Sequence, residues 1–252
     1  MRVFVLLALT LLATSPALAQ SQAELDERRA LIEQREANAT PDAFERKRRS
    51  IARMRAEGVP VLDTLPVIEG ESQARQRTKQ EIAYRAMSLL AVAARGEGVE
   101  REAVLGVAEG YGLGPHFSPA ERAFLHDPAP SDHDRVQFSW RYEAAWVMLW
   151  ALGYVDDLGR PDHICDVPKA VEAMLSRSAE QFIAQARLRP LPDILDQADL
   201  IYRYRWALVE ARVQGQAPPA GLEPGVAVER HHALNWLIGY LGQDWDEIST
   251  DT

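Results

Sequence analysis

Apolar residues from position 72 to the C-terminus follow a helical pattern almost throughout. In the segment after Thr78 they recur every three or four residues, which places them on one helix face: Ile82, Ala86, Leu89, Leu90 and Ala93. The same pattern predicts helices over 138–152, 191–213 and 224–241. There is no convincing run of alternating apolar and polar residues. We therefore expect an all-α fold, a single multi-helix domain with at most short peripheral strands.

Local signals place the starts and ends of these helices. Thr78, Ser118 and Ser178 are each followed three residues later by Glu or Gln, the spacing at which a cap and its partner satisfy each other's free N–H groups. Thr40 can cap an earlier helix, and Pro41 suits its first turn. Glycines after the apolar runs predict where helices end: Gly58, Gly96, Gly153 and Gly215.

The first 19 residues have the pattern of a secretory signal peptide. Arg2 precedes an apolar run over 3–13, and the segment closes with the small-x-small sequence that ends at Ala19. The run is shorter than the roughly 20 apolar residues that span a bilayer. We expect cleavage after Ala19 and a mature protein that is exported, to the periplasm, without a membrane span.

Two further regions follow the signal pattern. Residues 20–43 form a charged, helix-prone segment, and residues 44–252 form the helical domain. The helix that begins at Pro41 is basic and amphipathic, with Phe44, Ile51 and Met54 on roughly one side. A solvated face is the simpler interpretation. The alternative is contact with a membrane or an acidic partner, so a protein partner of these N-terminal helices stays possible.

Charge and cysteine content narrow the functional classes. The net charge is −9, which argues against a general nucleic-acid binder because such proteins displace counterions with positive charge. The single cysteine, Cys165, has no partner for an internal disulfide, so stability has to come from the core. It lies among apolar neighbours and is expected to be a buried, unreactive thiol.

Common catalytic signatures are missing, including a nucleophile elbow, a phosphate-binding loop and zinc-binding helix motifs. The loop over 126–134 carries two His and three Asp, which are residue types that bind zinc or calcium. Nothing in their spacing fixes a coordination geometry, so a flexible acidic loop is favoured. We predict no metal and no cofactor.

Polar residues inside the apolar helices are the strongest candidates for a site. Charged groups rarely lie among large apolar side chains unless they are paired. We therefore expect the charged members to pair between helices and Asn235 to bond nearby. The predicted cluster is Arg141, Glu143, Asp199, Tyr202, Arg203, Glu229, Arg230, His232 and Asn235. At the C-terminus, Trp245 and Ile248 should pack onto the domain and hold the tail down.

Several separated motifs resemble a known family. They are "LPVIEGE", "FSWRYEAAWVMLWALG", "ICDV", "DLIYRYRWAL", "ERHHALNWLIGY" and "WDEISTDT". Together they resemble the bacterial domain of unknown function 4272, from about residue 44 to the end. The resemblance implies a single, mostly helical domain and supplies no activity, substrate or catalytic residue.

Two functional hypotheses follow. The first is a non-catalytic binding or scaffolding protein, in which the buried charges only fix helix register. The alternative is a hydrolase or lyase that uses a carboxylate such as Glu143 or Glu229 beside Arg, His and Asn groups. Accessibility discriminates between them. A cluster open to solvent in a pocket favours the enzyme, and a sealed, fully paired cluster favours the structural role.

Overall fold

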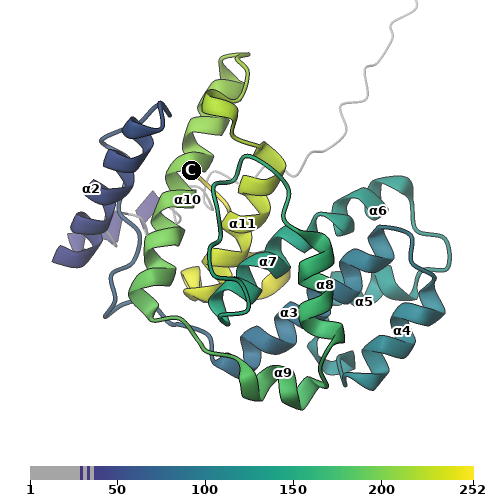
Figure 1. The fold of residues 1–252 in the computed structure, drawn as a ribbon. Helices are drawn as coiled ribbons and strands as arrows, with labels where there is room; N and C mark the ends of the chain where they lie inside the picture. Colours follow the sequence, from purple (N-terminus) through teal and green to yellow (C-terminus); the bar gives the residue numbers. More distant parts are fainter. Residues whose placement is uncertain (1–28, 31–32, 35–36) are drawn as a thin grey trace, which may run out of the picture. The chain divides into compact units, whose positions relative to one another are not determined.

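The computed structural model describes residues 29–30, 33–34 and 37–252 (Figure 1). Within this part of the chain all regular secondary structure is helical and no strand is present, which confirms the all-α prediction. The signal pattern over 1–19 lies outside the described residues, as does most of the charged segment over 20–43. Residues Ala39–Thr252 form one compact unit.

The helices of this unit are joined by loops and short 3₁₀ turns. The α-helices are α2 (Pro41–Ala56), α3 (Lys79–Gly96), α4 (Arg101–Gly110), α5 (Pro119–His126), α6 (Asp132–Ser139), α7 (Arg141–Ala151), α8 (Val167–Leu175), α9 (Ala179–Gln185), α10 (Leu191–Val213) and α11 (Pro224–Leu237). The 3₁₀ turns are η1 (Gly114–His116), η2 (Pro219–Gly221), η3 (Tyr240–Gly242) and η4 (Trp245–Glu247).

Helix α7 is the centre of the core. Every residue from Tyr142 to Ala151 is buried, as expected for a helix that is apolar on all sides. It packs against α3 on one side and α11 on another, and α11 in turn packs against α10 (Figure 1). Helices α4, α5, α6, α8 and α9 surround α3. Polar side chains on α7 are therefore buried unless they lie at an end of the helix.

The amphipathic helix α2 packs along α10 (Figure 1). Ile51 and Met54 are buried in this contact, whereas Phe44 is 42% exposed. The guanidinium of Arg46 is also buried, and it pairs with the carboxylates of Asp42 and Asp196. No helix in the described part of the chain is long and apolar enough to cross a membrane.

The capping predictions hold at three of four helix starts. The side chains of Thr78, Ser118 and Ser178 each accept a hydrogen bond from the backbone three residues on, and the Glu or Gln there bonds back. Thr40 occupies the N-cap position of α2 with Pro41 behind it, but its side chain makes no capping bond. The sequence pattern therefore locates that helix start without identifying its hydrogen bonds.

The predicted helix over 138–152 was wrong in its first part, because α6 ends at Ser139 and α7 begins at Arg141. The chain bends where it crosses the end of α3. A Cβ atom on Gly96 would lie 2.5 Å from the backbone nitrogen of Ser139 and 2.9 Å from the carbonyl carbon of Phe138. This close approach explains the glycine at that position, and periodicity along one segment does not reveal it.

The last helix is also shorter than predicted, since α11 ends at Leu237 rather than Leu241. Gly239 adopts a positive φ of 69°, and a Cβ there would lie 2.8 Å from the carbonyl oxygen of Arg75. The backbone N–H groups of Arg75 and Arg77 donate to the carbonyls of Ile238 and Leu237, at 2.9 and 3.0 Å. The segment before α3 thus supplies hydrogen-bond donors to the last carbonyl groups of α11, and the helix ends there.

The tail prediction is confirmed. Trp245 and Ile248 are 5% and 8% exposed, so both are packed into the domain. The carboxylate of Asp246 accepts a hydrogen bond from the backbone N–H of Ala120 at 2.9 Å. The C-terminal segment therefore closes over the start of α5.

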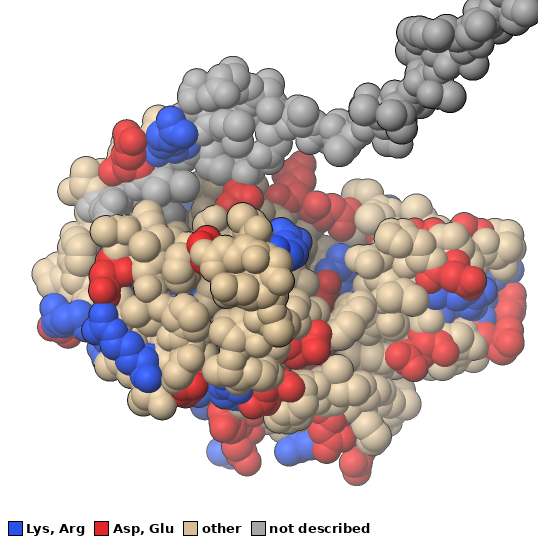
Figure 2. Space-filling view, turned by 90° about the horizontal axis from the view of Figure 1, so that it is seen from above, with Lys and Arg blue, Asp and Glu red and all other residues tan. Residues whose placement is uncertain are grey.

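Acidic and basic side chains alternate on the face shown in Figure 2. Blue and red residues are interspersed among uncharged ones, without a large area of one sign among the residues described there. Such mixing is the usual pattern for a solvated protein surface.

Candidate functional site

Two ion pairs join α7 to α11. The guanidinium of Arg141 lies 2.7 Å from the carboxylate of Glu229, and that of Arg230 lies 3.0 Å from the carboxylate of Glu143. Each helix contributes one acid and one base. These are inter-helix pairs of the kind that the sequence predicts, and together they fix how α7 and α11 are aligned.

The pair between Glu143 and Arg230 is sealed from solvent. The side chains are 2% and 3% exposed. Oε1 of Glu143 also accepts a hydrogen bond from the backbone N–H of Cys165, and Nη1 of Arg230 donates to the carbonyls of Leu158 and Gly159, at 2.9 and 3.1 Å. Both carboxylate oxygens are thus occupied, and the loop between α7 and α8 is tied to the pair.

The pair between Arg141 and Glu229 is nearer the surface, with side chains 22% and 13% exposed. Burial raises the pKa of Glu229, while the neighbouring positive charge of Arg141 opposes that rise. The nearby carboxylate of Glu143 acts in the same direction as burial. Burial therefore disfavours the anionic form of Glu229, and the guanidinium of Arg141 offsets this directly.

Asp199 and Arg203 do not pair between helices, which corrects the prediction for these two residues. They bond to each other along α10, with Asp199 Oδ1 and Oδ2 accepting from Arg203 at 2.7 and 2.8 Å. Residues four apart on one helix are neighbours on its surface, so this pairing needs no second helix. Arg203 also donates to the carbonyl of Pro66 at 3.2 Å, which anchors the extended segment before α3.

Asn235 and His232 hold the C-terminal tail rather than an ion pair. Nδ2 of Asn235 donates to the carbonyl of Ser249 at 2.8 Å. The ring of His232 meets the ring of Trp245 edge-on, with centroids 4.5 Å apart. Both side chains therefore act on the segment that closes the domain.

Tyr202 lies beside the buried ring of His231, with centroids 6.0 Å apart. Its ring is also 5.8 Å from the guanidinium carbon of Arg203. Tyr202 thus borders the Asp199–Arg203 pair on α10, whereas the Glu143 and Glu229 pairs link α7 with α11. The nine predicted residues are thus divided between the Asp199–Arg203 contact on α10, the two ion pairs between α7 and α11, and the contacts with the C-terminal tail.

A third buried ion pair escaped the sequence analysis. Arg85 of α3 and Glu121 of α5 are 6% and 1% exposed, and their charged groups are in hydrogen-bonding contact. Glu121 was assigned only its role in the Ser118 capping box, which it also fulfils. The available signal was Arg85 itself, a charged residue in the middle of an apolar helix.

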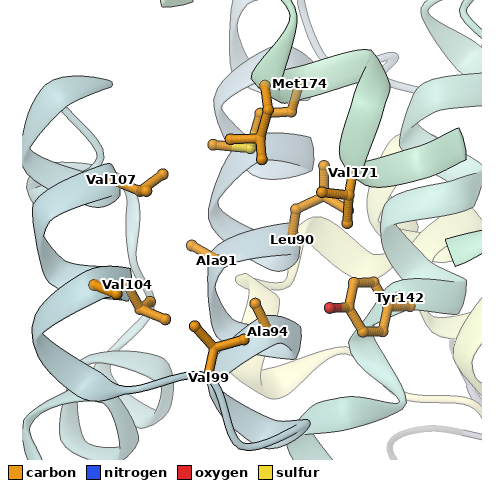
Figure 3. A pocket seen from close by; sticks show the side chains of 11 residues that line it. Leu90, Ala91, Ala94, Val99, Val104, Val107, Tyr142, Val171 and Met174 are labelled. Carbon is orange, nitrogen blue, oxygen red and sulfur yellow. The ribbon is translucent and has the colours of Figure 1, made fainter. Parts of the chain in front are cut away.

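An apolar cavity of about 320 Å³ opens between α3, α4, α7 and α8 (Figure 3). Leu90 and Ala91 of α3, Val104 of α4, and Val171 and Met174 of α8 form much of its wall. This volume falls within the range of small-molecule pockets, which are mostly apolar with a few polar groups. The sequence analysis missed it, because it arises only where four helices meet.

Tyr142 supplies the polar group of this cavity. Its side chain comes from α7 and its hydroxyl points toward the cavity interior (Figure 3). Among the lining residues that the structure describes, the other side chains are apolar. Burial raises the pKa of Tyr142 to about 12, so the hydroxyl is neutral near pH 7 and can donate or accept a hydrogen bond.

Tyr142 also borders a second hollow of about 220 Å³, beside Glu143 and Cys165. Burial raises the pKa of the Cys165 thiol, and the carboxylate of Glu143 raises it further. A thiol with a raised pKa is a poor nucleophile. His163, its nearest histidine in sequence, bonds instead to the carboxylate of Asp162 and is exposed. The hollow therefore lacks an activated nucleophile–base pair.

The His- and Asp-containing segment over 126–134 is partly helical, since α6 begins at Asp132 and Ser131 caps it. The expectation of a loop is wrong for its last residues and for His126, where α5 ends. Among the residues that the structure describes, no three or more His, Cys, Asp or Glu side chains are grouped to hold a metal ion.

A comparison with known families identifies the family to which this chain belongs. A family model described as "Domain of unknown function (DUF4272)" matches residues 46–248, and the chain therefore belongs to that family. No curated protein and no solved structure matches it. Family membership agrees with the resemblance seen in the sequence motifs, and it brings no activity to these residues.

The two ion pairs between α7 and α11 should differ in their contribution to stability. Glu143→Gln leaves Arg230 buried without a counter-charge, which costs about 3–5 kcal/mol. Glu229→Gln leaves Arg141 with access to solvent, which costs only about 1 kcal/mol. Urea unfolding of both variants measures the difference. Equal losses would contradict the distinction between a sealed pair and a partly exposed one.

Acid should destabilise the protein through its buried histidines. Burial lowers the pKa of His231 to about 3, with repulsion from Arg205 and His232 adding to the effect. The unfolded chain binds a proton near pH 6.5 and the folded chain does not, so stability is present above pH 6.5 and falls toward pH 3. His231→Gln should reduce the slope of unfolding free energy by about 1.4 kcal/mol per pH unit in that window. An unchanged slope in urea unfolding at several pH values would contradict this.

Proposed function

We propose that this member of the DUF4272 family is an exported binding protein, without catalysis of its own, that holds a small apolar ligand in the cavity between α3, α4, α7 and α8. The observation that carries the proposal is the Tyr142 hydroxyl, one polar group directed into an otherwise apolar lining (Figure 3). Such a site would take a ligand with an apolar body and a single hydrogen-bonding group.

The size of the cavity limits the ligand. A cavity of about 150 Å³ lined by apolar side chains accepts benzene. The present cavity, at about 320 Å³, is roughly twice that volume. A bicyclic aromatic compound or a short acyl chain fits such a space. Each buried CH₂ group of the ligand would contribute about 0.8 kcal/mol.

The state of the charged groups favours binding over the hydrolase or lyase alternative. A catalytic carboxylate needs a free oxygen within reach of a substrate. Both oxygens of Glu143 are already hydrogen-bonded, to Arg230 and to the backbone of Cys165. Glu229 is paired with Arg141. The charges are thus best explained by helix alignment, with the ligand held elsewhere.

The ligand site can be tested with N-phenyl-1-naphthylamine, a neutral dye that becomes fluorescent in apolar surroundings. Ala94 lies in the cavity wall, so Ala94→Phe fills the space and should weaken dye binding at least about tenfold. Ala52 is exposed on α2, and Ala52→Phe serves as the matched control with unchanged binding. Equal affinity of both variants and the parent protein would contradict the proposed site.

The same dye experiment also tests the role of the Tyr142 hydroxyl. Tyr142→Phe removes one hydroxyl, and it should weaken displacement of the dye by 1-naphthol about three- to tenfold. Displacement by naphthalene, which has no hydroxyl, should not change. A parallel change for both compounds would show that the substitution alters the cavity rather than one hydrogen bond.

The export part of the proposal rests on the signal pattern over 1–19. The protein made in a bacterial host with an export pathway should be recovered from the periplasm with residues 1–19 removed, as intact mass spectrometry measures. Charges placed in the apolar run, as in Leu7→Glu with Leu11→Glu, should keep the chain in the cytosol. Full-length parent protein in the cytosol would overturn this part.

A further inference from the structure

Another cavity, of about 240 Å³, lies at the C-terminal end of α10. Arg205 and Arg212 both line it, and their spacing of seven residues places them on one side of the helix. The loop after α10 contributes Pro218, and Pro224 at the start of α11 completes the wall. Figure 1 shows α10 and α11 side by side.

These two arginines have no counter-charge in the part of the chain that the structure describes. Among the described residues, no carboxylate lies within ion-pair distance of Arg205 or Arg212. Nε of Arg205 is buried and makes no hydrogen bond. Four other buried arginines of the domain are paired with carboxylates, namely Arg46, Arg85, Arg203 and Arg230, whereas buried Arg95 donates to the carbonyl of Val99.

The acids nearest in sequence are engaged in other contacts. The carboxylate of Glu210 accepts a hydrogen bond from the side chain of Gln214. The carboxylate of Glu223 caps α11 by accepting from the backbone N–H of Gly225 at 3.2 Å. Because Glu223 already accepts from the N–H group of Gly225, an anion in the cavity would be held by the arginines rather than by the N-terminal end of α11.

The positive charges of Arg205 and Arg212 in this cavity cost free energy without a neighbouring anion. Burial lowers the pKa of Arg205, and the like charge of Arg212 lowers it further. A buried donor that has no acceptor costs free energy, and an anion supplied from solution would remove that cost. Apart from Gln216, the remaining wall is apolar, with Leu208 and Val209 between the two arginines.

We propose that this cavity binds an organic oxyanion, a carboxylate or phosphate group carried on an apolar body. Guanidinium groups bind both anions through paired N–H donors, so Arg205 and Arg212 would hold the charged end. Leu208, Val209 and the two prolines would contact the apolar end. The lining shares no residue with the cavity beside Tyr142, so this site is independent of the proposed function.

Isothermal titration calorimetry with octyl phosphate and with octanoate tests the site, and the tighter of the two identifies the anion. Arg212 is exposed, so Arg212→Gln should fold normally and weaken binding tenfold or more. Arg205→Gln should do the same. Arg48 is 72% exposed and lies outside this cavity, and Arg48→Gln is the matched control with unchanged affinity.

Two further ligands separate the contribution of the charged group from that of the apolar body. Octanol lacks the charge and inorganic phosphate lacks the apolar body, so both should bind at least tenfold more weakly than octyl phosphate. The proposal is overturned if neither octyl phosphate nor octanoate binds at millimolar concentration, or if Arg212→Gln and Arg48→Gln bind them equally well. In that event Arg212 would serve only to stabilise the C-terminal end of α10.

Discussion

The buried ion pair between Glu143 and Arg230 is the constraint on which the rest of the domain depends. α7 is buried on all sides, so a charge on it has to be neutralised inside the protein. Arg230 of α11 supplies that neutralisation, and the backbone N–H of Cys165 takes the other carboxylate oxygen. The pair between Arg141 and Glu229 repeats the contact at the edge of the same helices. With two pairs formed, α7 can neither slide nor rotate against α11.

This alignment decides which way Tyr142 faces. Residues 141, 142 and 143 leave a helix about 100° apart, so fixing the first and third against α11 turns the second toward α3, α4 and α8. The hydroxyl of Tyr142 then enters an apolar cavity instead of the charged contact (Figure 3). The charged residues and the proposed ligand site are thus linked through three consecutive positions. Arg141 and Glu143 fix the position of α7, and Tyr142 presents its hydroxyl to the cavity.

The sequence predicted the helical class, three capping boxes, the bounds of α10 and the burial of Trp245 and Ile248 because each depends on local pattern. It also indicated that charges on apolar helices are paired. It could not choose the partners, since Asp199 has Arg203 on its own helix while Glu143 reaches across to α11. The cavity beside Tyr142 was missed because its wall combines four helices, each of which resembles ordinary core.

If the charges near α11 are structural, a ligand bound beside Tyr142 should leave them undisturbed. Amide chemical-shift mapping by ¹⁵N NMR during titration with 1-naphthol measures this. We expect the largest shifts on residues around the cavity, such as Ala91, Val104 and Val171, while Glu229 and His232 stay unchanged. Large shifts at Glu229 and His232, with none around the cavity, would contradict this expectation and place the site at the charged contact.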